Sequence, residues 1–126
     1  MVEGGPPQDS SVGREDPVAD IRRDDALIVV SLTGELDLYN AHTVRETLLE
    51  CCGESPERLV VDLSGVTFID STALGVLIEA RTRLPNRRGF LLAAPGLETR
   101  RALEISRLDR HFAVHESLDD ALAASL

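Results

Sequence analysis

The sequence has no lysine and no tryptophan, and each absence excludes a class of function. All 13 basic residues of the 126-residue chain are arginines. Without lysine there is no phosphate-binding lysine of the Walker A or protein-kinase type, and no amine to form a Schiff base with a substrate. Aromatic residues make up only 3% of the chain, too few for the stacking platforms that bind single-stranded nucleic acid.

Cysteines and long hydrophobic runs are also scarce. The two cysteines, Cys51 and Cys52, are adjacent, so they form neither a disulfide framework nor a C-x-x-C motif, and we expect them to be buried. No apolar stretch reaches the roughly 18 residues of a membrane span, and the first residues lack the basic-then-apolar pattern of a secretory signal. These features predict a cytoplasmic protein that does not contact membranes.

The charge balance points away from polyanionic partners. The chain has 22 acidic residues and a formal net charge of −9. Nucleic acids and anionic membranes are bound through basic surfaces, so direct binding to either is not expected. A length of 126 residues is typical of one domain that buries a core of its own.

The order of apolar segments predicts an α/β domain that follows an N-terminal tail. Residues 1–17 are rich in proline and glycine and almost free of apolar side chains, which predicts a disordered tail, and the domain then occupies residues 18–126. Within it, β-branched apolar runs alternate with segments of 3.6-residue periodicity, which indicates a mixed or partly parallel sheet covered by helices. We expect strands over 19–23, 26–33, 59–63, 90–94 and 112–115, and helices over 41–52, 71–83, 97–105 and 118–125.

Local signals also predict where these elements begin and end. Asn40, Asp70 and Ser117 each precede an expected helix and are suitable N-cap residues, because their side-chain oxygens accept hydrogen bonds from free amides. The strand over 59–63 is expected to end at Ser64-Gly65. Residues 66–69 are then expected to form a loop that leads to the next helix.

Two groups of polar residues leave alternatives open. His111 and His115 have the spacing of a helical zinc pair, but they flank a predicted strand and lack the glutamate of an H-E-x-x-H motif, so no metal site is predicted. Four arginines near the end of the second helix either bind an anion or only complement the negative end of the helix dipole. These arginines are Arg81, Arg83, Arg87 and Arg88.

The segment around Ser71 is the most informative candidate site. Ser71 follows a predicted buried strand and begins a helix, as the serine of a nucleophile elbow does, but its surroundings do not match G-x-S-x-G. The carboxylate of Asp70 would also oppose a developing oxyanion, so a serine hydrolase is not predicted. Asp, Ser and Thr are common in a first helical turn for structural reasons alone. The functional alternative is that Ser71 is an exposed acceptor for phosphate.

Two motifs resemble those of STAS domains, and specifically of free-standing anti-sigma factor antagonists. The motifs are LTGELD at residues 32–37 and LSGVTFIDSTALG at residues 63–75, and weaker similarity extends the resemblance over residues 18–126. The resemblance implies the STAS fold, a mixed and mostly parallel β-sheet of four or five strands flanked by about four helices. It also implies a binding protein that is not an enzyme and carries no cofactor or metal.

By the same resemblance, Ser71 is the residue that a partner anti-sigma factor kinase phosphorylates, with Thr72 as the second choice. The unphosphorylated protein would bind that anti-sigma factor and free its sigma factor, phosphorylation would end the binding, and a phosphoserine phosphatase is a further partner. The alternative is a STAS module that does not switch and serves as a scaffold or adaptor in a stress-signalling or lipid-transport assembly. The expected partner-binding residues are Asp37, Asn40, Asp70, Ser71, Thr72, Leu74 and Gly75.

Two positions depart from the family pattern. Ala73 stands where glycine is common, and its methyl group would slightly crowd the acceptor turn, the turn that carries the expected phosphate acceptor Ser71. Arg107 stands where a glycine usually ends a helix, so we expect Arg107 to be strained or to change how that helix ends.

Overall fold

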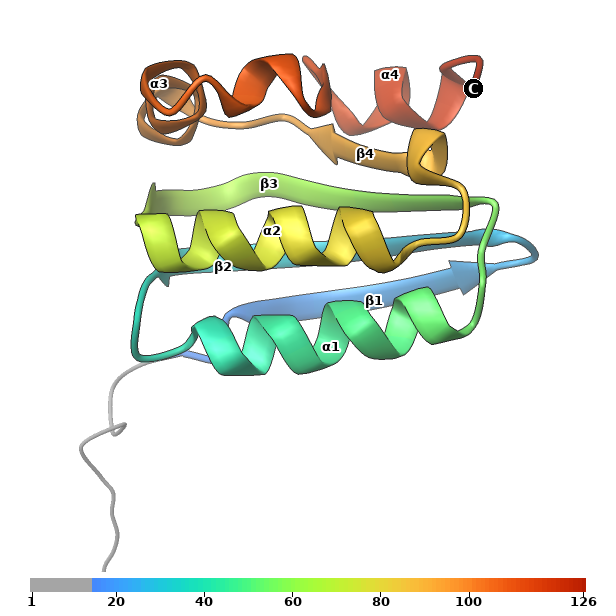
Figure 1. The fold of residues 1–126 in the computed structure, drawn as a ribbon, viewed down its shortest axis with the longest axis horizontal. Helices are drawn as coiled ribbons and strands as arrows, with labels where there is room; N and C mark the ends of the chain where they lie inside the picture. Colours follow the sequence, from blue (N-terminus) through green and yellow to red (C-terminus); the bar gives the residue numbers. More distant parts are fainter. Residues whose placement is uncertain (1–14) are drawn as a thin grey trace, which may run out of the picture.

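Residues 15–126, described by a computed structural model, form one mixed β-sheet with helices packed against it (Figure 1). The five strands lie in chain order across the sheet; β1 is antiparallel to β2, and each later strand is parallel to its neighbour. This architecture confirms the predicted fold class. The strands are β1 (Val18–Asp24), β2 (Leu27–Leu36), β3 (Arg58–Ile69), β4 (Phe90–Ala93) and β5 (Ala113–His115). The helices are α1 (Ala41–Gly53), α2 (Ser71–Arg83), α3 (Leu97–Ile105) and α4 (Leu118–Ala123), with short 3-10 helices η1 (Arg87–Gly89) and η2 (Leu108–Arg110).

The sheet carries a larger core on one face and a smaller core on the other. Buried residues of α1 and α2, such as Leu48 and Leu77, join Leu103 of α3 in the larger core. On the opposite face, Ala121 of α4 joins Val60 of β3 in the smaller core. Successive residues of a strand point to opposite faces, so a strand covered on both sides is apolar along its length. That is why the central strands were recognisable as continuous apolar runs.

β3 is longer than the sequence indicated, and this corrects one expectation. Residues 66–69 are not a loop but the second half of β3. They pair with the end of β2, where Gly34 lies opposite Val66 and Leu36 opposite Ile69. The register between the two strands shifts between Ser31 and Thr33 and again between Gly34 and Glu35, so regular alternation does not mark this part of the strand in the sequence.

Two of the three expected N-caps make the predicted hydrogen bond. Oδ1 of Asp70 accepts from the amide of Ala73 at 3.0 Å, and Oγ of Ser117 accepts from the amide of Asp120 at 3.0 Å. Asn40 occupies the N-cap position of α1, but the expected cap is wrong, because its Oδ1 accepts from the preceding loop instead. The side chain of Asn40 therefore serves the turn before the helix rather than the helix itself.

The strain expected at Arg107 is confirmed. Its backbone has φ 64° and ψ 16°, the left-handed conformation that glycine adopts without steric cost. For other residues this conformation costs about 1–2 kcal/mol. Ala73, the other departure from the family pattern, is a helical residue buried in the larger core, so its methyl group does not crowd the exposed side of the acceptor turn.

Cys51 and Cys52 are buried free thiols, as predicted. Sγ of Cys52 donates to the carbonyl oxygen of Ala80 at 3.3 Å, which ties α1 to α2. Burial raises the pKa of both thiols, that of Cys52 to about 11, because a thiolate is poorly solvated in the core.

The predicted domain boundary falls close to the first described residues. Residues 1–14 of the expected tail lie outside the part of the chain that the structure describes. Pro17, the last residue assigned to that tail, is buried, and its carbonyl oxygen accepts from the amide of Thr33 at 2.9 Å. Pro17 is therefore part of the folded domain.

Candidate functional site

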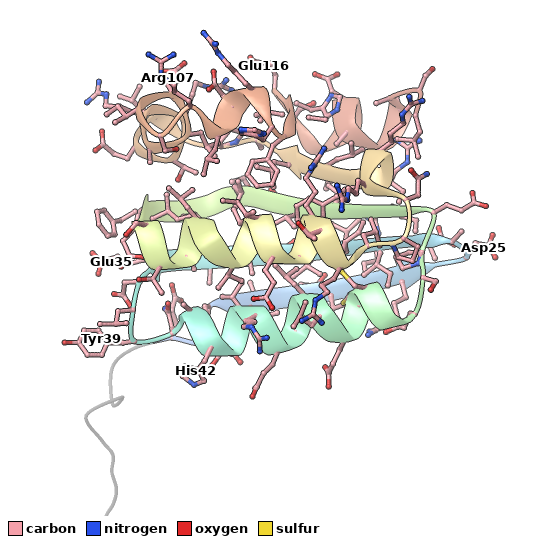
Figure 2. All side chains as sticks on the ribbon, in the orientation of Figure 1. Asp25, Glu35, Tyr39, His42, Arg107 and Glu116 are labelled. Atoms are coloured by element: carbon pink, nitrogen blue, oxygen red, sulfur yellow. The ribbon has the colours of Figure 1, made fainter. Side chains whose placement is uncertain are left out.

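The ends of β2 and β3 bring the two sequence motifs together. Leu36 and Ile69 are paired in parallel strands, so the segments that follow them leave the sheet at the same edge. These segments are the loop 37–40 and the first turn of α2. We define the acceptor edge as residues 37–40 and 68–75. Figure 2 shows Tyr39 at this end of the molecule, pointing outward.

Asp70 fastens the two halves of the acceptor edge to each other. Its Oδ1 caps α2 through the amide of Ala73, and its Oδ2 accepts from the amide of Leu38 at 3.1 Å. Its own amide donates to the carbonyl oxygen of Leu36 at 3.0 Å. One carboxylate thus satisfies a free amide of the helix and a free amide of the loop, which fixes the first turn of α2 relative to β2.

The loop 37–40 is held by its own polar side chains. Oδ1 of Asp37 accepts from the amide of Tyr39 at 3.0 Å, and Oδ1 of Asn40 accepts from the amide of Asp37 at 2.9 Å. Nδ2 of Asn40 donates to the carbonyl oxygen of Glu35 at 2.8 Å. Both side chains are half-buried and shape the turn, as Asp and Asn commonly do in turns.

Ser71 and Thr72 lie exposed in the first turn of α2. Within residues 15–126, neither hydroxyl is engaged in a hydrogen bond, so neither is needed to hold the fold. The first turn of a helix presents free amides and a partial positive charge, an environment that favours an added phosphate group. The geometry is therefore that of accessible hydroxyls on a rigid turn.

Leu74 and Gly75, both expected to contact a partner, occupy different places. Leu74 is only 7% exposed and packs in the larger core. It therefore anchors α2 to the core and offers a partner very little surface. Gly75 is exposed one turn after Ser71 on the same face of α2. Apart from its chain neighbours and the backbone of α2 itself, a Cβ added at Gly75 would meet no described atom within 4 Å, so the fold itself does not require glycine there.

Three exposed apolar side chains at the acceptor edge were not identified from the sequence. Leu38 is 66% exposed, Tyr39 75% and Phe68 47%. Leu38 follows Asp37 in the loop, and Phe68 lies on β3 just before Asp70. The sequence predicts a loop at Phe68, whereas the structure places it near the end of β3 with its side chain exposed. Exposed apolar groups bordered by polar ones are typical of protein-binding surfaces.

Other types of site find little support in residues 15–126. That part of the chain contains no group of three or more His, Cys, Asp or Glu side chains arranged to hold a metal ion. Nor does any helix there have the length and apolarity needed to cross a bilayer.

The fold and the acceptor edge together define a small mixed-sheet α/β domain with exposed hydroxyls on a rigid turn at one edge. The sequence model of the STAS domain family matches residues 18–121 of this chain. The chain belongs to the STAS domain family.

Similar proteins in this family are anti-sigma factor antagonists. The chain is 35% identical over 94 residues to the anti-sigma-F factor antagonist RsfB of Mycobacterium tuberculosis, covering 75% of this chain and 77% of the relative. It is also 35% identical to an anti-sigma factor antagonist from Mycobacterium paratuberculosis, whose crystal structure aligns with a TM-score of 0.76 over 81% of this chain and 87% of that chain. The anti-sigma factor antagonist SpoIIAA in its unphosphorylated form, at 18% identity, shares the fold, with a TM-score of 0.69 over 82% of this chain and 91% of that chain.

Proposed function

We propose that this chain is an anti-sigma factor antagonist whose binding is switched off by phosphorylation of Ser71. The observation that carries the proposal is the exposed, unbonded hydroxyl of Ser71 on a turn that Asp70 holds against the loop 37–40. The names of the similar proteins support the same function. In this proposal the unphosphorylated chain binds an anti-sigma factor at the acceptor edge, and the sigma factor is released.

The anti-sigma factor is also the kinase in this scheme. It transfers the γ-phosphoryl group of ATP to the hydroxyl oxygen of Ser71, with Thr72 as the second choice. ADP leaves, and the hydroxyl proton passes to a base of the kinase. This chain is therefore a substrate and binding partner and not itself an enzyme. A phosphoserine phosphatase returns the chain to its binding form. Phosphorylation and dephosphorylation both take place in the cytoplasm.

Charge explains why one phosphate ends the binding. Phosphoserine adds about −1.5 to −2 charges at neutral pH, directly after Asp70 in the chain and beside the loop that carries Asp37. Within the domain, the positive end of the α2 dipole offsets part of that repulsion, by about 0.3–1 kcal/mol. A partner surface that fits a neutral Ser71 has no such compensation. Phosphorylation therefore weakens the complex and leaves the fold intact.

The exposed apolar side chains supply the other part of the contact. Leu38 and Tyr39 lie in the loop 37–40, and Phe68 lies near the end of β3 just before Asp70. Burying these exposed side chains against the anti-sigma factor provides affinity that does not depend on the charge of Ser71. Asp37 and Asn40 contribute by holding the loop that presents Tyr39. Because Gly75 has no side chain, the backbone of a partner can approach the exposed face of α2 closely at this position.

Variants at Ser71 test the proposal. Ser71→Ala keeps the Asp70 cap, so the domain stays folded, binds the cognate anti-sigma factor at least as tightly as wild type, and takes up no phosphate. Ser71→Asp supplies one charge without the oxygens of phosphoserine, so its affinity lies between those of wild type and the phosphoprotein. The measurements are intact mass after incubation with the kinase and ATP, and dissociation constants. Thr72→Ala is the matched control and should still be phosphorylated.

Two outcomes would contradict this scheme. A full phosphate on the Ser71→Ala variant would move the acceptor to Thr72 or elsewhere. A wild-type chain that binds the active kinase but is never phosphorylated would instead favour the scaffold or adaptor function in a stress-signalling or lipid-transport assembly.

A further inference from the structure

A cavity at the far end of α2 gathers three arginines. Arg81 lies near the end of α2, and Arg87 and Arg88 belong to η1. They line a cavity of about 420 Å³ together with His115 of β5. Cavities that bind small molecules measure about 300–1,000 Å³, so this one is large enough for a ligand. Its remaining lining residues are Phe90, Leu91, Ala113, Ser125 and Leu126.

The structure separates these three arginines from the fourth member of the sequence cluster. Arg83 pairs with Glu79 at 3.5 Å and does not line the cavity. Within the described part of the chain, Arg81, Arg87 and Arg88 form no ion pair, although acidic residues far outnumber basic ones. Among residues 15–126, no Asp or Glu side chain lines the cavity either. Three positive charges, those of Arg87 and Arg88 on exposed side chains, therefore share one space without an acidic side chain among its described lining residues.

Compensation of the helix dipole accounts for a cation in the last turn of α2, but not for Arg87 and Arg88, which lie beyond that helix. The position of η1 is closely determined. Oδ1 of Asn86 accepts from the amide of Arg88 at 3.2 Å, and a Cβ on Gly89 would overlap the carbonyl oxygen of Glu57. The backbone that carries the two arginines is thus fixed against the start of β3.

We propose that this cavity binds the phosphate group of a small molecule through Arg81, Arg87 and Arg88. Guanidinium groups donate paired hydrogen bonds to phosphate oxygens, and a bound dianion would relieve the mutual repulsion of the three charges. The imidazole of His115 adds a further hydrogen-bond donor. The site is distinct from the acceptor edge, because Arg81 lies about 15 Å along α2 from Ser71 at the rise of an α-helix.

Calorimetric titration of the full chain tests this site, with inorganic phosphate and phenyl phosphate as probes at constant ionic strength. We expect saturable binding by wild type, and a loss of at least about tenfold in affinity for the double variant Arg87→Gln/Arg88→Gln, in which two charged hydrogen-bond donors are removed. Arg22→Gln is the matched control. Arg22 is an exposed arginine of β1, the outer strand on the other side of the sheet from β5. Its affinity should equal that of wild type.

Each outcome decides the matter. Tighter binding of phenyl phosphate would identify a phosphate ester as the ligand class, and equal binding of both probes would identify phosphate itself; both support the site. Absence of saturable binding at millimolar concentrations would overturn the proposal. So would an equal loss of affinity in the Arg22→Gln control, since that would reveal diffuse charge attraction rather than a site.

Discussion

At the residue scale, the polar side chains of the acceptor edge divide into two groups. Asp37, Asn40 and Asp70 direct their oxygens to backbone amides and so hold the turn in shape. Ser71 and Thr72 leave their hydroxyls exposed. Replacing a residue of the first group should alter the fold locally, and replacing one of the second should alter only modification or binding.

Gly75→Ala should separate the fold from the binding surface. Because Gly75 lies in an exposed helix interior with space for a Cβ, alanine should raise the free energy of unfolding by about 0.5–1 kcal/mol. The same methyl group should weaken binding to the anti-sigma factor. Gly53→Ala, at the end of α1 with similar space, is the control that should leave binding unchanged. A loss of stability on Gly75→Ala in urea denaturation would contradict the expectation.

Arg107→Gly should stabilise the protein by about 0.5–1 kcal/mol, because glycine relieves the left-handed strain but loses more chain entropy on folding. Arg110→Gly, in the neighbouring η2 where φ is not positive, should instead destabilise it slightly. Thermal denaturation of the two variants gives the comparison. If both lowered the melting temperature equally, the strain at Arg107 would be energetically unimportant.

At the element scale, helix and strand ends are set by contacts outside the element itself. The second half of β3 is extended because it pairs with β2. The start of α2 is fixed because the carboxylate of Asp70 also bonds the loop 37–40. The turn between α2 and β4 depends on Gly89, which packs on the backbone of Glu57.

Asp70→Ala should test the double role of this cap. It removes the bond to the amide of Ala73 and the bond to the amide of Leu38, so the free energy of unfolding should fall by about 1–2 kcal/mol. Hydrogen exchange at the amide of Leu38 should become faster. Ser117→Ala, which removes the cap of α4 alone, is the control that should leave exchange at Leu38 unchanged. Unaltered exchange at Leu38 in the Asp70 variant would show that the loop holds itself.

At the scale of the whole molecule, the thiols of Cys51 and Cys52 report on global folding, because both are buried where α1 packs on the sheet and α2. Their burial raises the pKa of each. In the native state both thiols therefore resist alkylation at neutral pH, since the reactive species is an exposed thiolate.

This burial also predicts how stability depends on pH. The pKa of Cys52 is about 11 in the folded chain, above the value of about 8.5 in an unfolded one. The folded state therefore holds its thiol proton more tightly, so stability should fall as pH rises between these two values. Urea denaturation at several pH values measures the slope, and Cys52→Ala should make it shallower. A slope unchanged by that variant would assign it to other groups.

Local signals in the sequence suffice to predict the order and type of the strands and α-helices and the place of the candidate site. Apolar runs and helical periodicity are local signals, and so are the caps Asp70 and Ser117, whose capping hydrogen bonds reach only three residues ahead. The motif around Ser71 can be recognised in the sequence because it, too, consists of consecutive residues. The exposure of its hydroxyl on a helix N-terminus followed from that local pattern.

Tertiary contacts, by contrast, set which segments lie beside the turn of Ser71 and which arginines line the cavity. The pairing of Leu36 with Ile69 joins segments far apart in the chain, and it turns an expected loop into a strand that exposes Phe68. The cavity that Arg81 shares with Arg87 and Arg88 is completed by residues from a distant part of the chain, among them His115 of β5. Such outcomes depend on contacts between distant residues, which no local period or propensity encodes, because packing sets which partner is near enough to bond.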